Sequence, residues 1–176
     1  MAGFLDEQQI GTNSYFGMTA HAEGEMVGFI NDLDDDQKQS LKEVVVAISA
    51  EAGLVYQQEA DSRAAMDGTL DAGRTAVVDV GCTDCHPFRG EESGDAPDLT
   101  GYASLEWLVG IISDPAHERF YGDNNDRMPS HHANPDNLQY NLLTLDEIHL
   151  LAQWLRGDQK DLQPLQPVIP ATSADE

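Results

Sequence analysis

The chain has 176 residues, and its 9 basic and 32 acidic side chains give a formal net charge of −23. This length suits one domain, or one domain with a smaller partner element. Because nucleic acids and anionic membrane surfaces would repel so acidic a protein, the charge argues against both as partners. Apolar residues make up 40% of the chain, which disfavours wholesale disorder. No run approaches the roughly 18 apolar positions of a membrane span.

The N-terminal third of the chain predicts one amphipathic helix, at about residues 36–52. Asp34 or Asp35 can cap its free amide groups, and Gly53 would end it. Residues 1–33 carry little periodic pattern. The stripe expected to face the core comprises Leu41, Val44, Val45, Ile48 and Ala52.

The rest of the chain predicts three further helices, at about residues 70–80, 104–113 and 144–156, and a polar stretch at residues 57–71 that is helical in part. The last opens with the capping box Thr144-Leu145-Asp146-Glu147 and ends at Gly157. The long segments between them are rich in Gly, Pro, Asn and Asp, which favours irregular loops. Such loops need a surface to pack on, and a large, rigid, apolar cofactor would provide one. Since strand patterns are nearly absent, we expect an all-α fold. The expected core stripe of the last helix comprises Ile148, Leu151, Trp154 and Leu155.

The only two cysteines belong to Cys82-Thr83-Asp84-Cys85-His86, which is a C-x-x-C-H haem attachment motif. Each thiol can add to one vinyl group of a haem, and the adjacent imidazole can then bind the iron. Two cysteines at this spacing close only a tiny loop, so they do not form a disulfide framework. The motif therefore predicts one covalently bound c-type haem.

Three other interpretations of the cysteine pair remain open. A thioredoxin-like dithiol expects a βαβ context, which the sequence lacks. A structural zinc site needs four ligands, and His131 or His132 could complete a set with the two cysteines and His86. Such a site would make the chain a zinc-stabilised interaction module with no redox role. Two inert free thiols are the third possibility.

Further motifs occur in a fixed order around the attachment site. Gly73 precedes it, and Ala96–Tyr102, Trp107-Leu108, Arg127-Met128-Pro129 and Trp154–Gly157 follow it. In this order and spacing, residues 70–158 resemble a class I cytochrome c domain. The closest resemblance is to the domains that accompany, or are fused to, bacterial cytochrome b/c1-type quinol oxidoreductases. It implies a class I cytochrome c fold, in which helices and long loops surround one haem.

The resemblance implies that His86 and Met128 bind the haem iron from opposite sides. Met128 lies in the loop before the last helix, where the family carries its methionine ligand. Thioether ligation raises the reduction potential, as suits an electron carrier. If Met128 is not the ligand, His131 or His132 is the next candidate.

The same resemblance assigns further cofactor-binding positions. Pro97 matches the proline beside the proximal imidazole, and neighbouring carbonyls can accept the Nδ1 proton of His86. Leu99, Tyr102 and Trp107 complete the expected set, with the two aromatic residues on the propionate side of the haem or in the ordinary core.

One helix crossing is also implied by the resemblance. Gly73 and Trp154 match the small-against-large contact at which the first and last helices of the family fold cross each other.

A weak internal repeat relates the N-terminal part of the chain to its C-terminal part. In both copies an aromatic–glycine group precedes a methionine and then an acidic-capped helix. Met26 would then be the axial ligand of another haem whose attachment half the sequence does not contain, and a packing role is favoured. The paired segments are Tyr15-Phe16-Gly17 with Phe120-Tyr121-Gly122, Met26 with Met128, and residues 36–52 with residues 144–156.

We therefore expect four regions along the chain. Residues 1–56 form a helical extension resembling the C-terminal half of a second cytochrome c domain, and residues 57–69 form a linker. The extension is expected to dock on the haem domain or on a second chain. Residues 70–159 form the monohaem domain, and residues 160–176 form a Pro-rich acidic tail.

The resemblance implies an electron carrier and not an enzyme, because two protein ligands leave the iron no open position for oxygen or peroxide. The expected partners are redox proteins, namely a quinol-oxidising cytochrome b/c1-type complex and another cytochrome c or an oxidase. The acidic charge would steer the chain toward a basic docking patch or serve solubility. A haem sensor or enzyme in which Met128 dissociates is the alternative.

The resemblance also implies a place in the cell, since haem attachment to such motifs occurs on the outer, periplasmic face of the bacterial cytoplasmic membrane. The N-terminus lacks the basic start and apolar middle of a signal peptide. We expect the soluble part of a membrane-associated respiratory subunit, held at the membrane only through a partner or an anchor outside this sequence.

Overall fold

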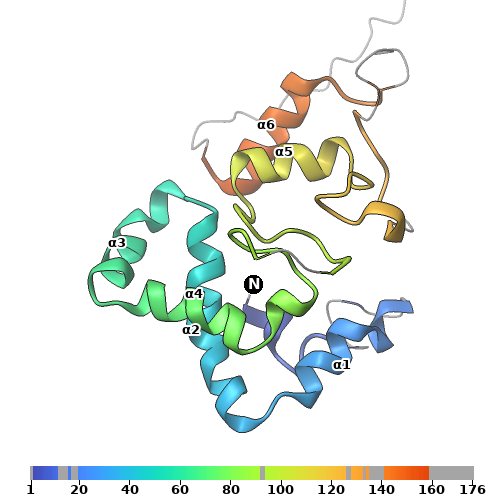
Figure 1. Ribbon diagram of the computed structural model, residues 1–176. Coiled ribbons are helices and arrows are strands. Elements are labelled where there is room, and N and C mark those ends of the chain that lie inside the picture. Colours follow the sequence, from blue (N-terminus) through green and yellow to red (C-terminus); the bar gives the residue numbers. More distant parts are fainter. Residues whose placement is uncertain are drawn as a thin grey trace, which may run out of the picture.

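The computed structural model describes residues 2–11, 16, 20–91, 94–125, 128–132, 134 and 141–158. The expected tail at 160–176 lies outside these residues, as do Tyr15, Gly17 and Arg127 of the sequence motifs. In the described part the chain is all-α, as predicted, and contains no strand. The helices are α1 (Glu25–Asp32), α2 (Asp35–Glu51), α3 (Gln58–Met66), α4 (Thr69–Asp79), α5 (Leu105–Ser113) and α6 (Leu145–Arg156) (Figure 1).

The two predicted N-terminal caps are confirmed. At α2, Asp34 accepts a hydrogen bond from the backbone N–H of Gln37, and the Gln37 side chain accepts one from the N–H of Asp34. Thr144 and Glu147 form the same reciprocal capping box at α6. Because a cap depends only on residues within one turn, these helix starts could be located from the sequence alone.

The main core lies where α2 crosses α4. Gly73 on α4 is so close to α2 that an added Cβ would meet the carbonyl oxygen of Glu43 and the Cβ of Ala47. Val44 of α2 and Val77 of α4 are both completely buried in this core. The N-terminal extension therefore docks on the helix that leads into the cysteine pair.

The predicted contact between Gly73 and Trp154 is wrong. Gly73 lies against α2, and the Trp154 side chain is 61% exposed on α6. The physical reason is that α2 already covers the face of α4 that carries the glycine, so that α6 packs on α5 (Figure 1).

Helix α6 buries a narrower stripe than predicted. Ile148 is completely buried, as expected, but the second buried position is Ala152, one turn further on. Leu151 and Leu155, which were predicted to face the core, are exposed. A helix that packs mainly on one neighbour needs one i, i+4 row of apolar side chains, and among the described helices α6 packs mainly on α5.

Arg156 joins the α5–α6 pair to the rest of the protein. Its guanidinium Nη1 donates to the carbonyl oxygens of Ala52 at 2.6 Å and Ala103 at 2.8 Å, and its side chain is only 8% exposed. Ala52 follows the last residue of α2, where the helix dipole places partial negative charge. The arginine therefore holds the end of α6 against the end of α2.

Helix α1 was not predicted. It has eight residues, begins after Gly24, and buries Val27 and Ile30 in the core that α2 and α4 share. So short a helix is marginal by itself and depends on its tertiary contacts. No helix in the described part of the chain combines the length and apolar character needed to cross a membrane.

Candidate functional site

The attachment motif forms a tight turn directly after α4. Gly81 adopts a left-handed conformation (φ +96°) that ends the helix, and Cys82–Asp84 then form a short 3-10 turn. The backbone N–H groups of Cys85 and His86 both donate to the carbonyl of Cys82, at 3.3 and 2.9 Å. This compact turn holds the two thiols and the imidazole together at the end of one rigid helix.

His86 is held by the contact predicted for it. Its Nδ1 lies 2.8 Å from the carbonyl oxygen of Pro97. A carbonyl can only accept, so Nδ1 carries the proton and Nε2 keeps its lone pair. Burial lowers the pKa of His86, which opposes protonation of that lone pair, although the bond to Pro97 acts the other way. Burial therefore favours the neutral imidazole, and the bond to Pro97 orients its ring as a metal-binding histidine requires.

The two cysteines are free thiols in different surroundings. Cys82 is partly buried, and burial raises its pKa to about 11. Cys85 is exposed. Reactive dithiol motifs depend on a lowered thiol pKa, so the environment of Cys82 does not favour the thioredoxin-like interpretation.

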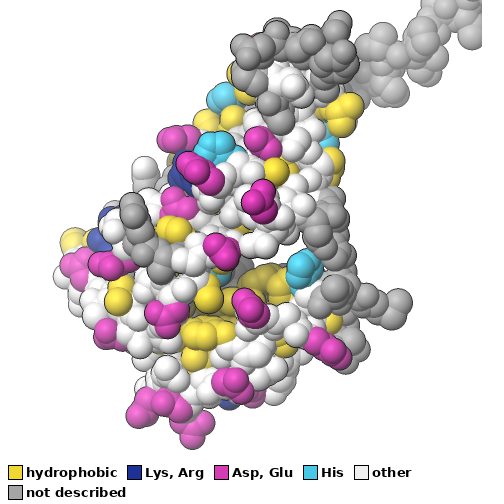
Figure 2. All heavy atoms as spheres, turned by 45° about the vertical axis from the view of Figure 1, so that its right-hand side comes forward, with side chains coloured by type: hydrophobic (Ala, Val, Ile, Leu, Met, Phe, Trp, Pro, Cys, Tyr) yellow, Lys and Arg dark blue, Asp and Glu magenta, His cyan; other side chains and the backbone are white. Residues whose placement is uncertain are grey.

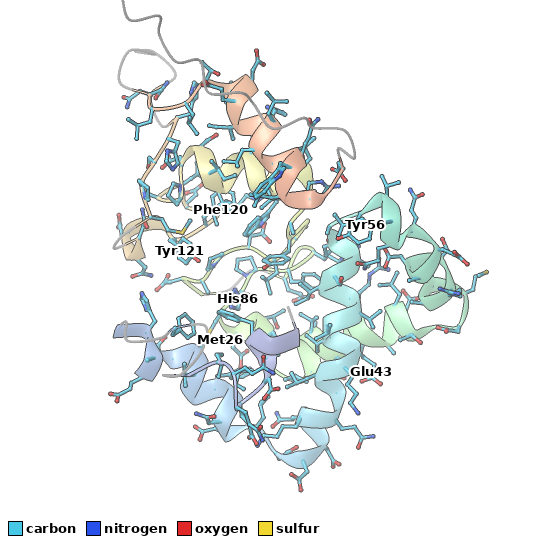
Figure 3. The ribbon with its side chains drawn as sticks, turned by 180° about the vertical axis from the view of Figure 1, so that it is seen from behind. Met26, Glu43, Tyr56, His86, Phe120 and Tyr121 are labelled. Atoms are coloured by element: carbon cyan, nitrogen blue, oxygen red, sulfur yellow. The ribbon has the colours of Figure 1, made fainter. Side chains whose placement is uncertain are left out.

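A cavity of about 110 Å³ lies between α1 and the turn formed by Gly81–His86, which we call the attachment turn. Figure 2 shows a hollow floored by apolar side chains, with acidic side chains around it. Figure 3 shows Met26 of α1 next to His86, and both line the cavity. The lining residues are Glu25, Met26, Phe29, Gly81, Cys82, Cys85, His86 and Ala96.

The lining fits a c-type haem in its chemistry. It contains two thiols for covalent attachment, an imidazole with a free Nε2, a thioether sulfur and apolar side chains. The cavity volume of about 110 Å³ is too small to enclose a haem, since even pockets that bury drug-sized ligands hold roughly 300–1,000 Å³. A haem at this place would therefore leave much of its ring outside the present cavity, or α1 would lie further from the turn.

The loop after the motif lies directly on the attachment turn. Gly94 has a left-handed backbone (φ +73°), and an added Cβ would collide with the backbone of Cys85. Two residues later, the N–H of Ala96 donates to the carbonyl of Cys85 at 3.1 Å. This close approach brings Pro97 to the imidazole of His86 and requires glycine at position 94.

The other residues expected to bind the cofactor support this loop and do not line the cavity. The N–H of Leu99 donates to the carbonyl of Pro87, and Leu99 and Tyr102 pack on the main core. Trp107 is buried, and its Nε1 donates to the carbonyl of Asp98 at 2.8 Å. The rings of Tyr102 and Trp107 lie 4.9 Å apart. Both aromatic residues therefore contribute to core packing, and the indole N–H already has a partner within the protein.

Met128 lies apart from the cavity lining. Its side chain is 38% exposed, and its backbone N–H and carbonyl are both bound to the side chain of Asn125, at 3.0 and 2.9 Å. Met26 lines the cavity together with His86. Of the two methionines that the repeat pairs, the structure brings the earlier one to the attachment motif.

His131 and His132 lie at the end of α5. Their backbone N–H groups donate to the carbonyl of Ser113, at 3.0 and 2.9 Å, and Nδ1 of His132 donates to the carbonyl of Leu143. Among the described residues, which include all five proposed zinc ligands, no three His, Cys, Asp or Glu side chains are grouped as a metal ion would require. The four-ligand zinc site thus receives no support from the geometry.

Glu51 was missed by the sequence analysis. Its carboxylate, 6% exposed, accepts from Nε of Arg89 at 2.7 Å and from the N–H of Gly101 at 2.9 Å. It therefore fixes both ends of the loop that carries Pro97. No local pattern could have indicated this role, because the contacts join residues far apart in the sequence.

Comparison with protein-family models, with curated proteins and with solved structures finds no match to this chain.

Proposed function

We propose that this chain is an electron-transfer protein that carries one c-type haem, attached through Cys82 and Cys85 and bound at the iron by His86. In this proposal residues 70–159 adopt a class I cytochrome c fold, and a methionine thioether is the second axial ligand. The observation that carries the proposal is the hydrogen bond from His86 Nδ1 to the carbonyl of Pro97, which leaves Nε2 free at the attachment turn.

The chemistry of each residue follows from its surroundings. Each thiol would add its S–H across a vinyl C=C bond, so that a thioether forms and no atom is lost. The carbonyl of Pro97 holds the Nδ1 proton and makes the His86 imidazole a stronger donor. Phe29 and Ala96 supply apolar walls. When bound, the haem supplies an iron that changes between its ferrous and ferric states.

The surface charge suits transfer between proteins. A net charge of −23 would speed encounter with a basic docking surface on a redox partner, and added salt would slow it. We propose a cytochrome b/c1-type complex, another cytochrome c or an oxidase as such partners, on the periplasmic face of the bacterial membrane.

The test is the intact mass of the denatured full chain, made in a host that attaches c-type haem. We expect the mass of one haem in addition to the polypeptide, and no added mass in the Cys82→Ala/Cys85→Ala variant. A chain that carries no haem under these conditions would overturn the proposal, and a colourless chain with bound zinc would favour the interaction module.

The visible spectrum separates the carrier from the haem sensor or enzyme. A six-coordinate carrier should show a sharp reduced α-band that carbon monoxide does not change. A spectrum that changes with carbon monoxide would indicate a ligand that dissociates and would favour the sensor.

A further inference from the structure

We propose that Met26 of α1, and not Met128, is the second axial ligand of the haem attached at Cys82 and Cys85. The inference rests on the proposed function and adds that the N-terminal extension completes the cofactor site. Two independent observations carry it, namely the position of Met26 and the crossing of α2 with α4.

The first observation is that one cavity brings the necessary donor groups together. Met26 lines it with Cys82, Cys85 and His86, and Met128 does not. A thioether in an apolar, partly enclosed place is a suitable iron ligand opposite an imidazole. Because methionine is unbranched and has three rotatable side-chain bonds, its sulfur can adjust to a bound ring without disturbing the helix.

Helix α1 is fixed to the same body as the attachment turn. Val27 and Ile30 are buried in the core that contains Val77 and Val80 of the α4 segment. An added Cβ at Gly81, just before the motif, would lie 3.7 Å from the ring of Phe29 on α1. Met26 is therefore part of the packed structure around the motif.

The second observation concerns the helix that follows each methionine. The resemblance assigns the crossing with Gly73 to the helix after Met128, but the structure gives this crossing to α2, the helix after Met26. The segment that carries Met26 therefore packs, together with α2, on the helix that leads into the cysteine pair.

The two methionines also differ in how firmly they are held. Met26 packs against the main core. Met128 is 38% exposed in an irregular segment whose backbone is bound to Asn125. A ligand to iron should lie in the better-packed position, because small reorganisation between oxidation states requires a rigid ligand set.

The experiment compares two matched variants of the haem-loaded full chain, Met26→Leu and Met128→Leu. Leucine keeps the apolar volume and removes the sulfur, so the pair isolates ligation. We expect Met26→Leu to lose the sulfur-to-iron charge-transfer band of the ferric protein, to lower the midpoint potential and to bind carbon monoxide when reduced. Met128→Leu should keep the band, the potential and the insensitivity to carbon monoxide.

Every other pattern overturns the inference. Loss of the band in Met128→Leu, with the band kept in Met26→Leu, would return the ligand to Met128, and a band kept in both variants would exclude both methionines. If the Met26→Leu variant does not fold or does not retain haem, the Met26→His variant is used in its place. A bis-histidine spectrum of that variant supports the inference, and a retained sulfur-to-iron band refutes it. A wild-type chain whose intact mass shows no haem would overturn the proposed function itself, so the intact mass distinguishes that outcome from failure of the Met26 assignment.

Discussion

Substitution of Gly73 by alanine tests the α2–α4 crossing through the sign of the stability change. In an exposed helix, a Gly→Ala change stabilises by about 0.5–1 kcal/mol, because glycine loses more backbone entropy on folding. At Gly73 the added methyl group would meet the Glu43 carbonyl and approach the Cβ of Ala47 to 2.9 Å. Ordinary contacts begin at 3.4 Å, so Ala47 alone must retreat by 3.4 − 2.9 = 0.5 Å.

Such a retreat cannot be local, because Glu43 and Ala47 lie on the same face of α2 as the completely buried Val44. Overpacking of this kind costs about 1–3 kcal/mol. Because the clash is with the backbone carbonyl of Glu43, we take the upper part of this range, about 2–3 kcal/mol; after subtraction of about 1 kcal/mol for helix propensity, we expect a net destabilisation of about 1–2 kcal/mol. With a urea slope of about 2 kcal/mol/M, the unfolding midpoint should fall by about 0.5–1 M.

The assay is urea unfolding of the full chain followed by circular dichroism, with Gly28→Ala as the matched control. Gly28 lies on the exposed side of α1, and an added Cβ there has no neighbour within 4 Å. We expect Gly28→Ala to leave stability unchanged or raise it by up to about 1 kcal/mol. A Gly73→Ala chain as stable as the wild type, or more stable, would refute the crossing.

Three further substitutions or reactions test the fold and the site. Trp154→Ala should cost less than about 1 kcal/mol in urea unfolding, because the side chain is 61% exposed, whereas truncation of a buried tryptophan costs about 3–5 kcal/mol. A loss in that higher range would place Trp154 in the core. In the haem-free chain at pH 8, iodoacetamide should modify Cys82 more slowly than the exposed Cys85, because burial raises the pKa of Cys82 to about 11. Peptide mass mapping over time measures both rates, and equal rates would contradict the burial of Cys82. Glu51→Gln should destabilise the chain by about 1 kcal/mol, because it removes the negative charge from the ion pair with Arg89. The effect is modest because the Arg89 side chain is partly exposed. An unchanged urea midpoint would show that Glu51 does not stabilise the loop that carries Pro97.

The parts of the fold that were predicted correctly depend on neighbouring residues in the sequence. The caps at Asp34 and Thr144 and the helix end at Gly81 are each determined within one turn, and all three are present. A bond from His86 Nδ1 to a carbonyl near Pro97 was also expected from the resemblance, and the partner is the carbonyl of Pro97 itself.

The parts that were missed depend on which segments meet in space. Helix α1 is too short to show a periodic pattern, and its buried Ile30 gains its place only from tertiary contacts. The Trp154 contact was predicted from the resemblance, and the motifs that carry the resemblance do not specify whether α2 or α6 covers α4. Glu51 acts on two distant backbone positions and carries no signal in its own surroundings.

The choice between α2 and α6 for one face of α4 explains both outcomes at the candidate site. Both helices begin with a reciprocal capping box, so their starts do not distinguish them. Two physical differences favour α2. The segment that joins α2 to α4 (residues 52–68) is shorter than the segment that joins α4 to α6 (residues 80–144). The shorter connection lowers the entropy cost of bringing the two helices together. In addition, α2 presents the small Ala47 to Gly73, where the backbones can approach closely, while α6 carries the bulky Trp154. Once α2 occupies that face, α1 and Met26 are brought to the attachment turn, and the loop with Met128 lies with the α5–α6 pair.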